Sequence, residues 1–86
     1  MIEVCFKPSF VRQAKRLDKE LFDEVLEKIE QFRDKNNHKK LGIHKLHGPL
    51  AGKWSFSVNY KIRIVFEYEN PTTAVLLAIG NHSIYD

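Results

Sequence analysis

The stretch 53–66, KWSFSVNYKIRIVF, constrains the fold most, because its apolar and polar residues alternate. Successive side chains of a strand point to opposite faces of the sheet, so this alternation predicts a strand that is buried on one face. A turn at 59–61 and a second strand at 62–67 complete a predicted hairpin. The apolar side chains of both strands are expected to share one face: Trp54, Phe56, Val58, Ile62, Ile64 and Phe66.

Arg63 interrupts the apolar residues of the second predicted strand and shares its face with Val65 and Glu67. A guanidinium group is costly to bury unless it stays hydrated or binds an anion. One interpretation places this arginine on the solvated face of an antiparallel sheet, as is common for charged residues. The other interpretation is an arginine held on a rigid strand, where it can bind a phosphate.

The length of 86 residues predicts a single domain that spans 1–86. Hydrophobic residues make up 43% and aromatic residues 12%, which is typical of a folded protein. The single cysteine, Cys5, cannot form an internal disulfide, and we expect a buried thiol in a reducing cytoplasm. No signal peptide and no apolar run of about 20 residues is visible, so we expect no membrane partner.

The positive charge is concentrated in the middle of the chain. Residues 35–63 contain seven lysine or arginine residues, three histidines and no acidic residue. An acid-free stretch of this length favours a polyanionic partner, although a solvated basic loop is the alternative. His44 and His47 lie three residues apart, but no cysteine or carboxylate accompanies them, so a metal site is not expected.

The remaining segments predict an α+β domain. A strand over 2–6 is followed by a helix that Ser9 is expected to cap and by a second helix that Asp18 is expected to cap. The second helix carries one broad apolar stripe. Its members are Leu21, Phe22, Val25, Leu26, Ile29 and Phe32. A loop is expected over 41–52, which is rich in glycine and proline.

The apolar run 73–79, TAVLLAI, is typical of a central strand that is buried on both faces. The predicted order is therefore β-α-α-β-β-β, with a helical hairpin packed on one face of a small, mostly antiparallel sheet. Trp54 is expected in the core. The opposite face, which bears Ser55, Ser57 and Arg63, is expected to be partly open and to border the basic loop.

The run GKWSFSVNYKIRIVF, followed by LLAIGNHSIYD, resembles the RelE/ParE superfamily of bacterial type II toxins. The lead-in KLHGPLAGKWSF, the arginine at position 63 and the closing IG-x-H…Y are most similar to RelE-like messenger RNA interferases, including the YafQ-like group. The resemblance covers the whole chain in the order of its elements, and its motifs lie within 45–85.

The resemblance implies ribosome-dependent cleavage of messenger RNA in a bacterial cytoplasm, without a metal or a small-molecule cofactor, and neutralisation by a cognate antitoxin. It places Arg63 against the scissile phosphate, makes His82 a general acid or base, and gives Tyr85 a stacking or positioning role. The ribosome and its messenger RNA are the expected partners. Contacts to flanking phosphates are expected from Lys45, His47, Lys53 and Lys61.

Two questions stay open at the level of sequence. No second proton-transfer group matches the family pattern, and His44 and His47 are the candidates. ParE-like members of the superfamily bind DNA gyrase and do not cut RNA, so a gyrase-binding toxin or a catalytically silent antitoxin-binding module is the alternative function. The basic segment 35–63, together with His82, favours RNA as the target.

Overall fold

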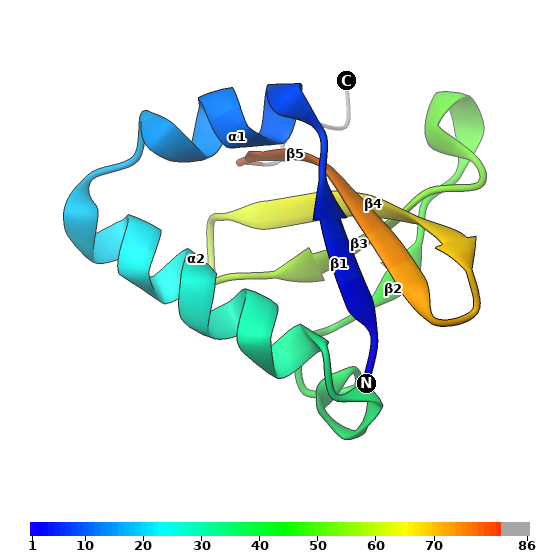
Figure 1. Cartoon of the computed structure of the whole chain (residues 1–86). Helices are drawn as coiled ribbons and strands as arrows, with labels where there is room; N and C mark the ends of the chain where they lie inside the picture. The colour runs from blue at the N-terminus through cyan, green and yellow to red at the C-terminus, as the bar shows by residue number, and fades with distance from the viewer. Residues whose placement is uncertain (82–86) are drawn as a thin grey trace.

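The computed structural model describes residues 1–81, which form a five-stranded sheet and two α-helices (Figure 1). The elements, in chain order, are β1 (Glu3–Phe6), α1 (Pro8–Lys15), α2 (Lys19–Phe32), a 3-10 turn (Lys35–Asn37), β2 (His44–Lys45), a second 3-10 turn (Gly48–Leu50), β3 (Trp54–Ser57), β4 (Arg63–Asn70) and β5 (Thr73–Gly80). Within these described residues, no helix is both long enough and apolar enough to cross a membrane.

The strand order across the sheet is β1-β5-β4-β3-β2. Only the β1–β5 pair is parallel, and the other three pairs are antiparallel, which confirms the predicted α+β class and its mostly antiparallel sheet. The predicted hairpin is present as β3 and β4, with Phe56 opposite Ile64. The segment 41–52 differs from the expected loop because it contains β2, whose two residues pair with β3 and are too few to give a periodic signal.

The run 73–79 forms β5, but the middle of the sheet is occupied by β4. β5 buries one face against the helices, while Val75 and Ala78 on its other face are half-exposed, so the expectation of burial on both faces was wrong. Leu77 is an extra residue in β5, because Val65 pairs with Ala78 and Phe66 pairs with Leu76. Such a bulge leaves backbone groups without ladder partners.

Helix α1 supplies side-chain partners to the backbone beside this bulge. The Ser9 hydroxyl donates to the carbonyl of Leu77 at 2.8 Å, and the Gln13 side-chain oxygen accepts from the backbone N–H of Ile79 at 2.9 Å. Ser9 therefore does not cap the helix, although the sequence had suggested that it would. The N-cap residue is Lys7, and Pro8 occupies the first helical position, where its missing N–H costs nothing.

Helix α2 begins at the predicted cap, because the Asp18 carboxylate accepts from the backbone N–H of Leu21 at 2.9 Å. Three side chains of its apolar stripe are buried: Val25, Ile29 and Phe32. Leu26 is 51% exposed, so the stripe is wider than the surface that the sheet covers.

Stacked aromatic rings join α2 to the sheet face that the alternation predicted. The Phe32 ring stacks on the Phe56 ring with centroids 4.6 Å apart and meets the Phe66 ring edge-on at 4.8 Å. All three side chains are fully buried. This contact confirms that the helical hairpin packs on the face bearing Phe56, Ile64 and Phe66.

The opposite face is more closed than expected. Ser57 and Arg63 are half-exposed there, as predicted, but Ser55 is fully buried and Val65 is nearly so. Ser55 lies beneath His44, its register partner on β2. Cys5 is exposed, contrary to the expected buried thiol, because β1 is an edge strand and Cys5 points away from the helices.

We expect Phe56→Ala to lower the free energy of unfolding by about 3–5 kcal/mol, because it removes a buried ring from the aromatic stack. Urea denaturation of both proteins would measure this difference. Tyr60→Ala is the matched control, since Tyr60 is 89% exposed and its loss should change stability by less than about 0.5 kcal/mol. A loss at position 56 below about 1 kcal/mol would contradict the packing that the structure describes.

Candidate functional site

Arg63 is the first residue of β4 and lies in the interior of the sheet. Its backbone pairs with Ser57 of β3 on one side and with Gly80 of β5 on the other. Both neighbours are small, so the half-buried arginine side chain lies on the sheet face opposite the helices without a large side chain beside it. The position is rigid because two ladders fix its backbone.

The guanidinium group of Arg63 is held by the loop that joins β3 to β4. Its Nη1 atom donates to the carbonyl oxygen of Asn59 at 2.7 Å, with longer contacts to the carbonyls of Tyr60 at 3.3 Å and Ile62 at 3.4 Å. Among residues 1–81, the Nε and Nη2 atoms donate no hydrogen bond. Arginine presents five N–H donors in a planar fork, so this arrangement leaves donors for a bidentate contact with an anion.

The loop that holds Arg63 is itself well defined. The side-chain oxygen of Asn59 accepts from the backbone N–H groups of Lys61 at 2.8 Å and Ile62 at 2.9 Å. This is an Asx-type turn, in which a side chain replaces a backbone acceptor. The Asn59 amide nitrogen also donates to Glu24 of α2 at 3.3 Å, which ties the loop to the helical layer.

A shallow depression beside the loop is lined by Tyr60, Lys61, Arg63 and Asn81. Its lining among residues 1–81 carries two positive charges and no carboxylate, so its electrostatics favour an anion. Lys61 and Arg63, both named by the sequence analysis, therefore line the same depression. Asn81 directly precedes His82 in the sequence, and the predicted roles of His82 and Tyr85 fall outside the described residues.

A second basic group lies at the other end of β3. Lys45 of β2 pairs with Trp54, and the backbone N–H of Leu46 donates to the carbonyl of Lys53 at 2.9 Å, so Lys45 lies beside the residue that precedes β3. His47 is exposed where the second 3-10 turn begins. Trp54 and Ser57 are three residues apart, so roughly 10 Å of strand separates this group from Arg63.

Trp54 is half-buried and has neighbours on several sides. The Lys45 ammonium lies 5.4 Å from its ring centroid, the Phe66 ring stacks at 6.4 Å, and Tyr68 meets it edge-on at 5.5 Å. Burial raises the pKa of the Tyr68 hydroxyl above its usual value, so this residue stays neutral. These contacts assign Trp54 to the edge of the core rather than to an open base-stacking surface.

His44 was one of two histidines that the sequence could not distinguish, and the structure separates them. The parity of the strands puts His44 on the sheet face of Ser55, Ser57 and Arg63, whereas His47 is in a loop. The His44 Nδ1 atom is 3.0 Å from the carbonyl oxygen of Gly42, which can only accept, so Nδ1 carries the proton. In the neutral ring Nε2 is then an acceptor, and it lies 3.4 Å from the Ser55 hydroxyl.

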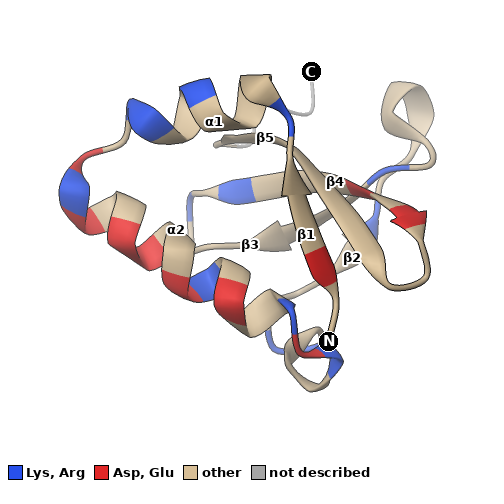
Figure 2. Ribbon diagram, in the orientation of Figure 1, with Lys and Arg blue, Asp and Glu red and all other residues tan. Residues whose placement is uncertain are grey.

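The acidic residues are concentrated elsewhere. Figure 2 shows them chiefly along α2, where Asp23, Glu24, Glu27 and Glu30 follow one another. Within residues 1–81, no three histidine, cysteine or carboxylate side chains lie close enough together to hold a metal ion. The acidic side chains of the helical layer therefore lie on α2, whereas α1 carries Arg12 and Lys15 and no acidic residue.

No protein-family model and no curated protein sequence matches the chain. Solved structures do match its fold. A chain of the toxin-antitoxin complex RelBE2 from Mycobacterium tuberculosis is 20% identical, with 94% of this chain and 98% of that chain covered at a TM-score of 0.78. A chain of the YoeB-YefM complex from Staphylococcus aureus is 17% identical, with coverage of 95% and 98% and a TM-score of 0.73.

A chain of the archaeal RelE-RelB complex from Pyrococcus horikoshii is 15% identical, with 93% of each chain covered and a TM-score of 0.72. These likenesses extend over nearly the whole length of both partners in each comparison. The chain therefore has the fold of the RelE/ParE superfamily toxins, as the sequence resemblance predicted.

Proposed function

We propose that this protein is the toxin of a bacterial type II toxin-antitoxin pair and that it cleaves ribosome-bound messenger RNA without a metal. The observation that carries the proposal is Arg63, held by loop carbonyls on a RelE-like sheet with donors directed at no other described group. The depression beside it, whose described lining is basic and holds no carboxylate, supports an anionic substrate. We place the activity in the bacterial cytoplasm, where translating ribosomes are found.

The reaction fits the chemistry of these residues. The 2′-hydroxyl of a ribose attacks the adjacent phosphorus, the bond to the leaving 5′ oxygen breaks, and negative charge grows on the equatorial phosphate oxygens. A fixed guanidinium at Arg63 stabilises this transition state more than the ground state. Lys61 adds positive charge beside it.

Proton transfer requires further groups. Gly80 is the register partner of Arg63, and His82 follows Gly80 by two residues in the sequence. We assign His82 the role of general acid or base and Tyr85 a positioning role. Of the two candidates for a second group, His44 is favoured, because it shares the sheet face of Arg63.

The two basic groups suggest how RNA lies on the protein. Lys61 and Arg63 are at one end of β3, and Lys45, His47 and Lys53 are at the other. An RNA strand that runs along β3 on the face of Arg63 contacts Lys61, Arg63 and Lys53 through its phosphates. It reaches Lys45, which lies over Trp54 on the other face, around the edge strand β2. Phosphate contacts of this kind position RNA and make its binding dependent on salt.

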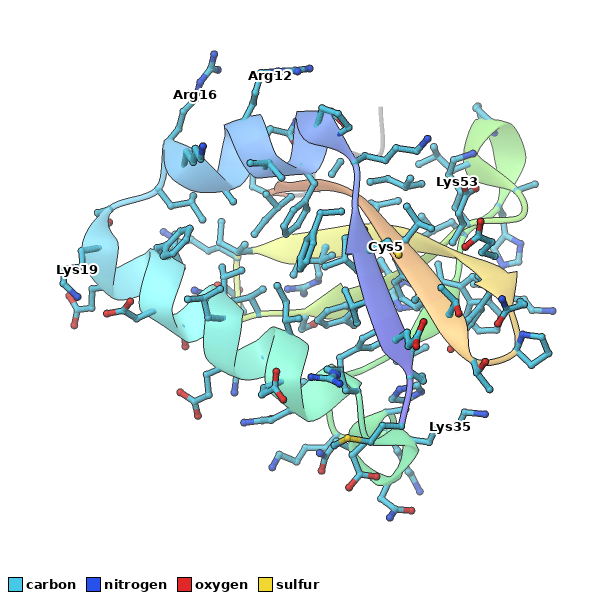
Figure 3. All side chains as sticks on the ribbon, viewed as in Figure 1. Cys5, Arg12, Arg16, Lys19, Lys35 and Lys53 are labelled. Atoms are coloured by element: carbon cyan, nitrogen blue, oxygen red, sulfur yellow. The ribbon has the colours of Figure 1, made fainter. Side chains whose placement is uncertain are left out.

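We expect the double variant Lys45→Glu, Lys53→Glu to bind ribosomes more weakly and with a flatter dependence on salt, because two phosphate contacts become repulsive. Binding across a salt series would measure both effects. The matched control is Arg12→Glu, Arg16→Glu, since these side chains project from α1 at the top of the view, away from Lys53 at its right (Figure 3). Equal affinity and slope for wild type and the Lys45, Lys53 variant would contradict the assignment.

The proposed partner that silences the protein is a cognate antitoxin, since the similar solved structures are complexes of toxins with antitoxins. A segment that folds across the basic face would bring acidic or apolar side chains to it. The gene for a short antitoxin should lie beside the gene for this chain. Expression without the antitoxin should stop growth.

The experiment that tests the function is controlled induction in growing cells, with protein synthesis and DNA synthesis followed separately. We expect protein synthesis to stop first and new 5′ ends to appear within messages. If DNA synthesis stops first and messages stay intact, the protein acts as a gyrase-binding toxin. Unaffected growth would identify a catalytically silent antitoxin-binding module.

A further inference from the structure

The outer edge of β1 has no strand beside it within residues 1–81. β1 is at the end of the sheet order and pairs only with β5. An edge strand presents a row of N–H and C=O groups to which another strand can pair. This edge is separate from the basic face proposed above for RNA, which lies over β2, β3 and β4.

Hydrogen bonds at both ends of β1 show which backbone groups point outward. The N–H groups of Glu3 and Lys7 donate to carbonyls of the β5 side, those of Thr72 and Leu76. Because a strand directs alternate residues to opposite edges, the N–H and C=O groups of Val4 and Phe6 point outward.

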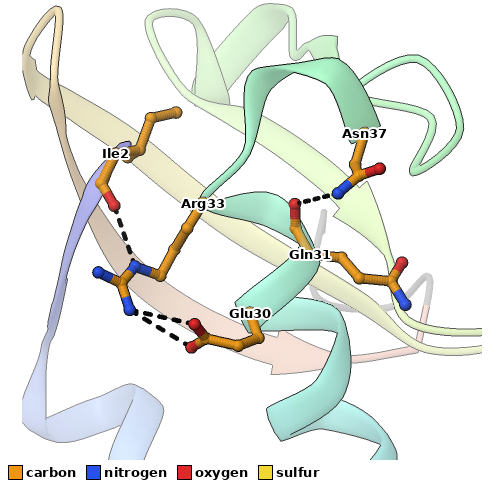
Figure 4. Close-up of polar contacts among 5 residues, drawn as sticks. All are labelled: Ile2, Glu30, Gln31, Arg33 and Asn37. Atoms are coloured by element: carbon orange, nitrogen blue, oxygen red, sulfur yellow. Dashed lines mark hydrogen bonds and ion pairs between the residues drawn. The ribbon is translucent and has the colours of Figure 1, made fainter.

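Arg33 closes this outer edge at residue 2. The backbone N–H of Ile2 donates to the Arg33 carbonyl at 2.9 Å, and the Arg33 Nε atom donates to the Ile2 carbonyl at 3.3 Å (Figure 4). An ion pair with Glu30 at 3.2 Å fixes the guanidinium. The accessible part of the edge is therefore limited to Val4 and Phe6.

Apolar surface accompanies these backbone groups. The Phe6 side chain is 49% exposed, although it touches Phe10. A depression between β1 and α2 is lined in part by Val4, Phe6 and Ile29. A second depression, which adjoins the first at Phe6 and Ile29, is lined by side chains of α1 and α2. No described side chain fills either depression.

We propose that the edge of β1 binds the same edge of a second copy of this chain, in an antiparallel pair with its two-fold axis at Cys5. Val4 then lies opposite the partner's Phe6, and the two residues exchange both hydrogen bonds, as outward-facing pairs do. The two-fold axis repeats this pair, which gives four hydrogen bonds. The partner's Phe6 enters the depression beside Val4 and Ile29.

The sequence of this segment is self-complementary in the proposed register. Glu3 lies opposite the partner's Lys7, and Lys7 opposite the partner's Glu3, on the face away from the helices. Lys7 is extended, with φ −74° and ψ 148°, so the alternation of side chains continues through it. Opposite charges directly across a strand pair attract, and this match favours a second copy over an unrelated strand.

Other two-fold registers use fewer backbone groups. An axis at Val4 leaves Phe6 opposite the partner's Ile2, whose backbone groups are already bonded to Arg33. An axis at Phe6 brings Val4 opposite the partner's Pro8, which has no N–H. The axis at Cys5 alone uses both outward-facing residues of each chain.

Charge reversal tests this register. Wild-type protein should sediment as a dimer whose proportion rises with concentration, and Glu3→Lys should weaken dimerisation at least tenfold, because two lysine pairs now face each other. The swapped variant Glu3→Lys, Lys7→Glu should restore it. The control Glu20→Lys changes the net charge by the same amount, but on α2, and should leave dimerisation unchanged. Purely monomeric wild-type protein, or no effect of Glu3→Lys, would overturn the proposal.

Cys5 provides a second measurement. Residues opposite each other in the pair without hydrogen bonds have Cα atoms about 4.5 Å apart, which is within the range for a disulfide. Mild oxidation should therefore link wild-type chains and the swapped variant much faster than Glu3→Lys chains. Equal rates of oxidation for these three proteins would mean that the chains are linked by random collision, and this result would refute the register. If the wild-type protein is a monomer and Glu3→Lys weakens only antitoxin binding, the edge of β1 binds an antitoxin strand instead of a second copy.

Discussion

Arg63→Ala is expected to lower the rate of message cleavage by about 10²–10³, as for the loss of one oxyanion-stabilising donor. In the proposed mechanism the guanidinium acts on charge that develops in the transition state, so binding to the ribosome should change much less than the rate. Single-turnover cleavage on programmed ribosomes, with affinity measured separately, would distinguish the two effects. Arg63→Lys should recover only part of the rate, since it keeps the charge and loses the planar fork.

Arg63 also donates to loop carbonyls, so its removal can loosen the loop between β3 and β4. Asn59→Ala is the control for this effect, because it removes the Asx-type turn and leaves the guanidinium in place. We expect Asn59→Ala to keep most of the activity if charge stabilisation dominates. An Arg63→Ala rate within a few-fold of wild type would contradict the proposed role.

His82→Ala is expected to lower the cleavage rate by about 10²–10⁴, the usual range for one general acid or base. The wild-type rate should change with pH around the ordinary histidine pKa of about 6.5, and the variant should lose this dependence. If His82 donates a proton, the rate falls as the pH rises through that value. If His82 accepts a proton, the rate falls as the pH drops through it.

His38→Ala is the matched control for this prediction. His38 has a structural position, with Nε2 at 2.8 Å from the Phe32 carbonyl and its ring stacked on Phe32. Its loss should lower stability and leave the pH dependence intact. Chelating agents should not change the wild-type rate. Near-wild-type activity of His82→Ala would favour the gyrase-binding or silent alternatives.

The fold was largely predictable, because its strongest signals are local. The alternation in 54–58 identified the buried face, and the helical spacing of Val25, Ile29 and Phe32 identified the surface that packs on it. The Asp18 cap was also predictable, since it depends on residues three apart. Arg63 was placed correctly on the face opposite the helices by strand parity alone.

Features that depend on strand order were not predictable. The exposure of Cys5 follows from the position of β1 at the edge, and the burial of Ser55 follows from the pairing of β3 with β2. Neither pairing leaves a periodic signal in so few residues. Likewise, no sequence pattern predicts that Arg63 donates to the carbonyl of Asn59, because this contact depends on the conformation of the loop.

The parallel pair of β1 with β5 joins residues about seventy positions apart, such as Glu3 with Thr73, and α1 is fastened to the same strand through Ser9. Such distant contacts form slowly, since a long loop has to close first. During synthesis the N-terminal strand therefore cannot pair with its neighbour until residues 73–80 have left the ribosome. Until β5 emerges, Arg63 also lacks its register partner Gly80, so the candidate site is completed in the same late step as the sheet.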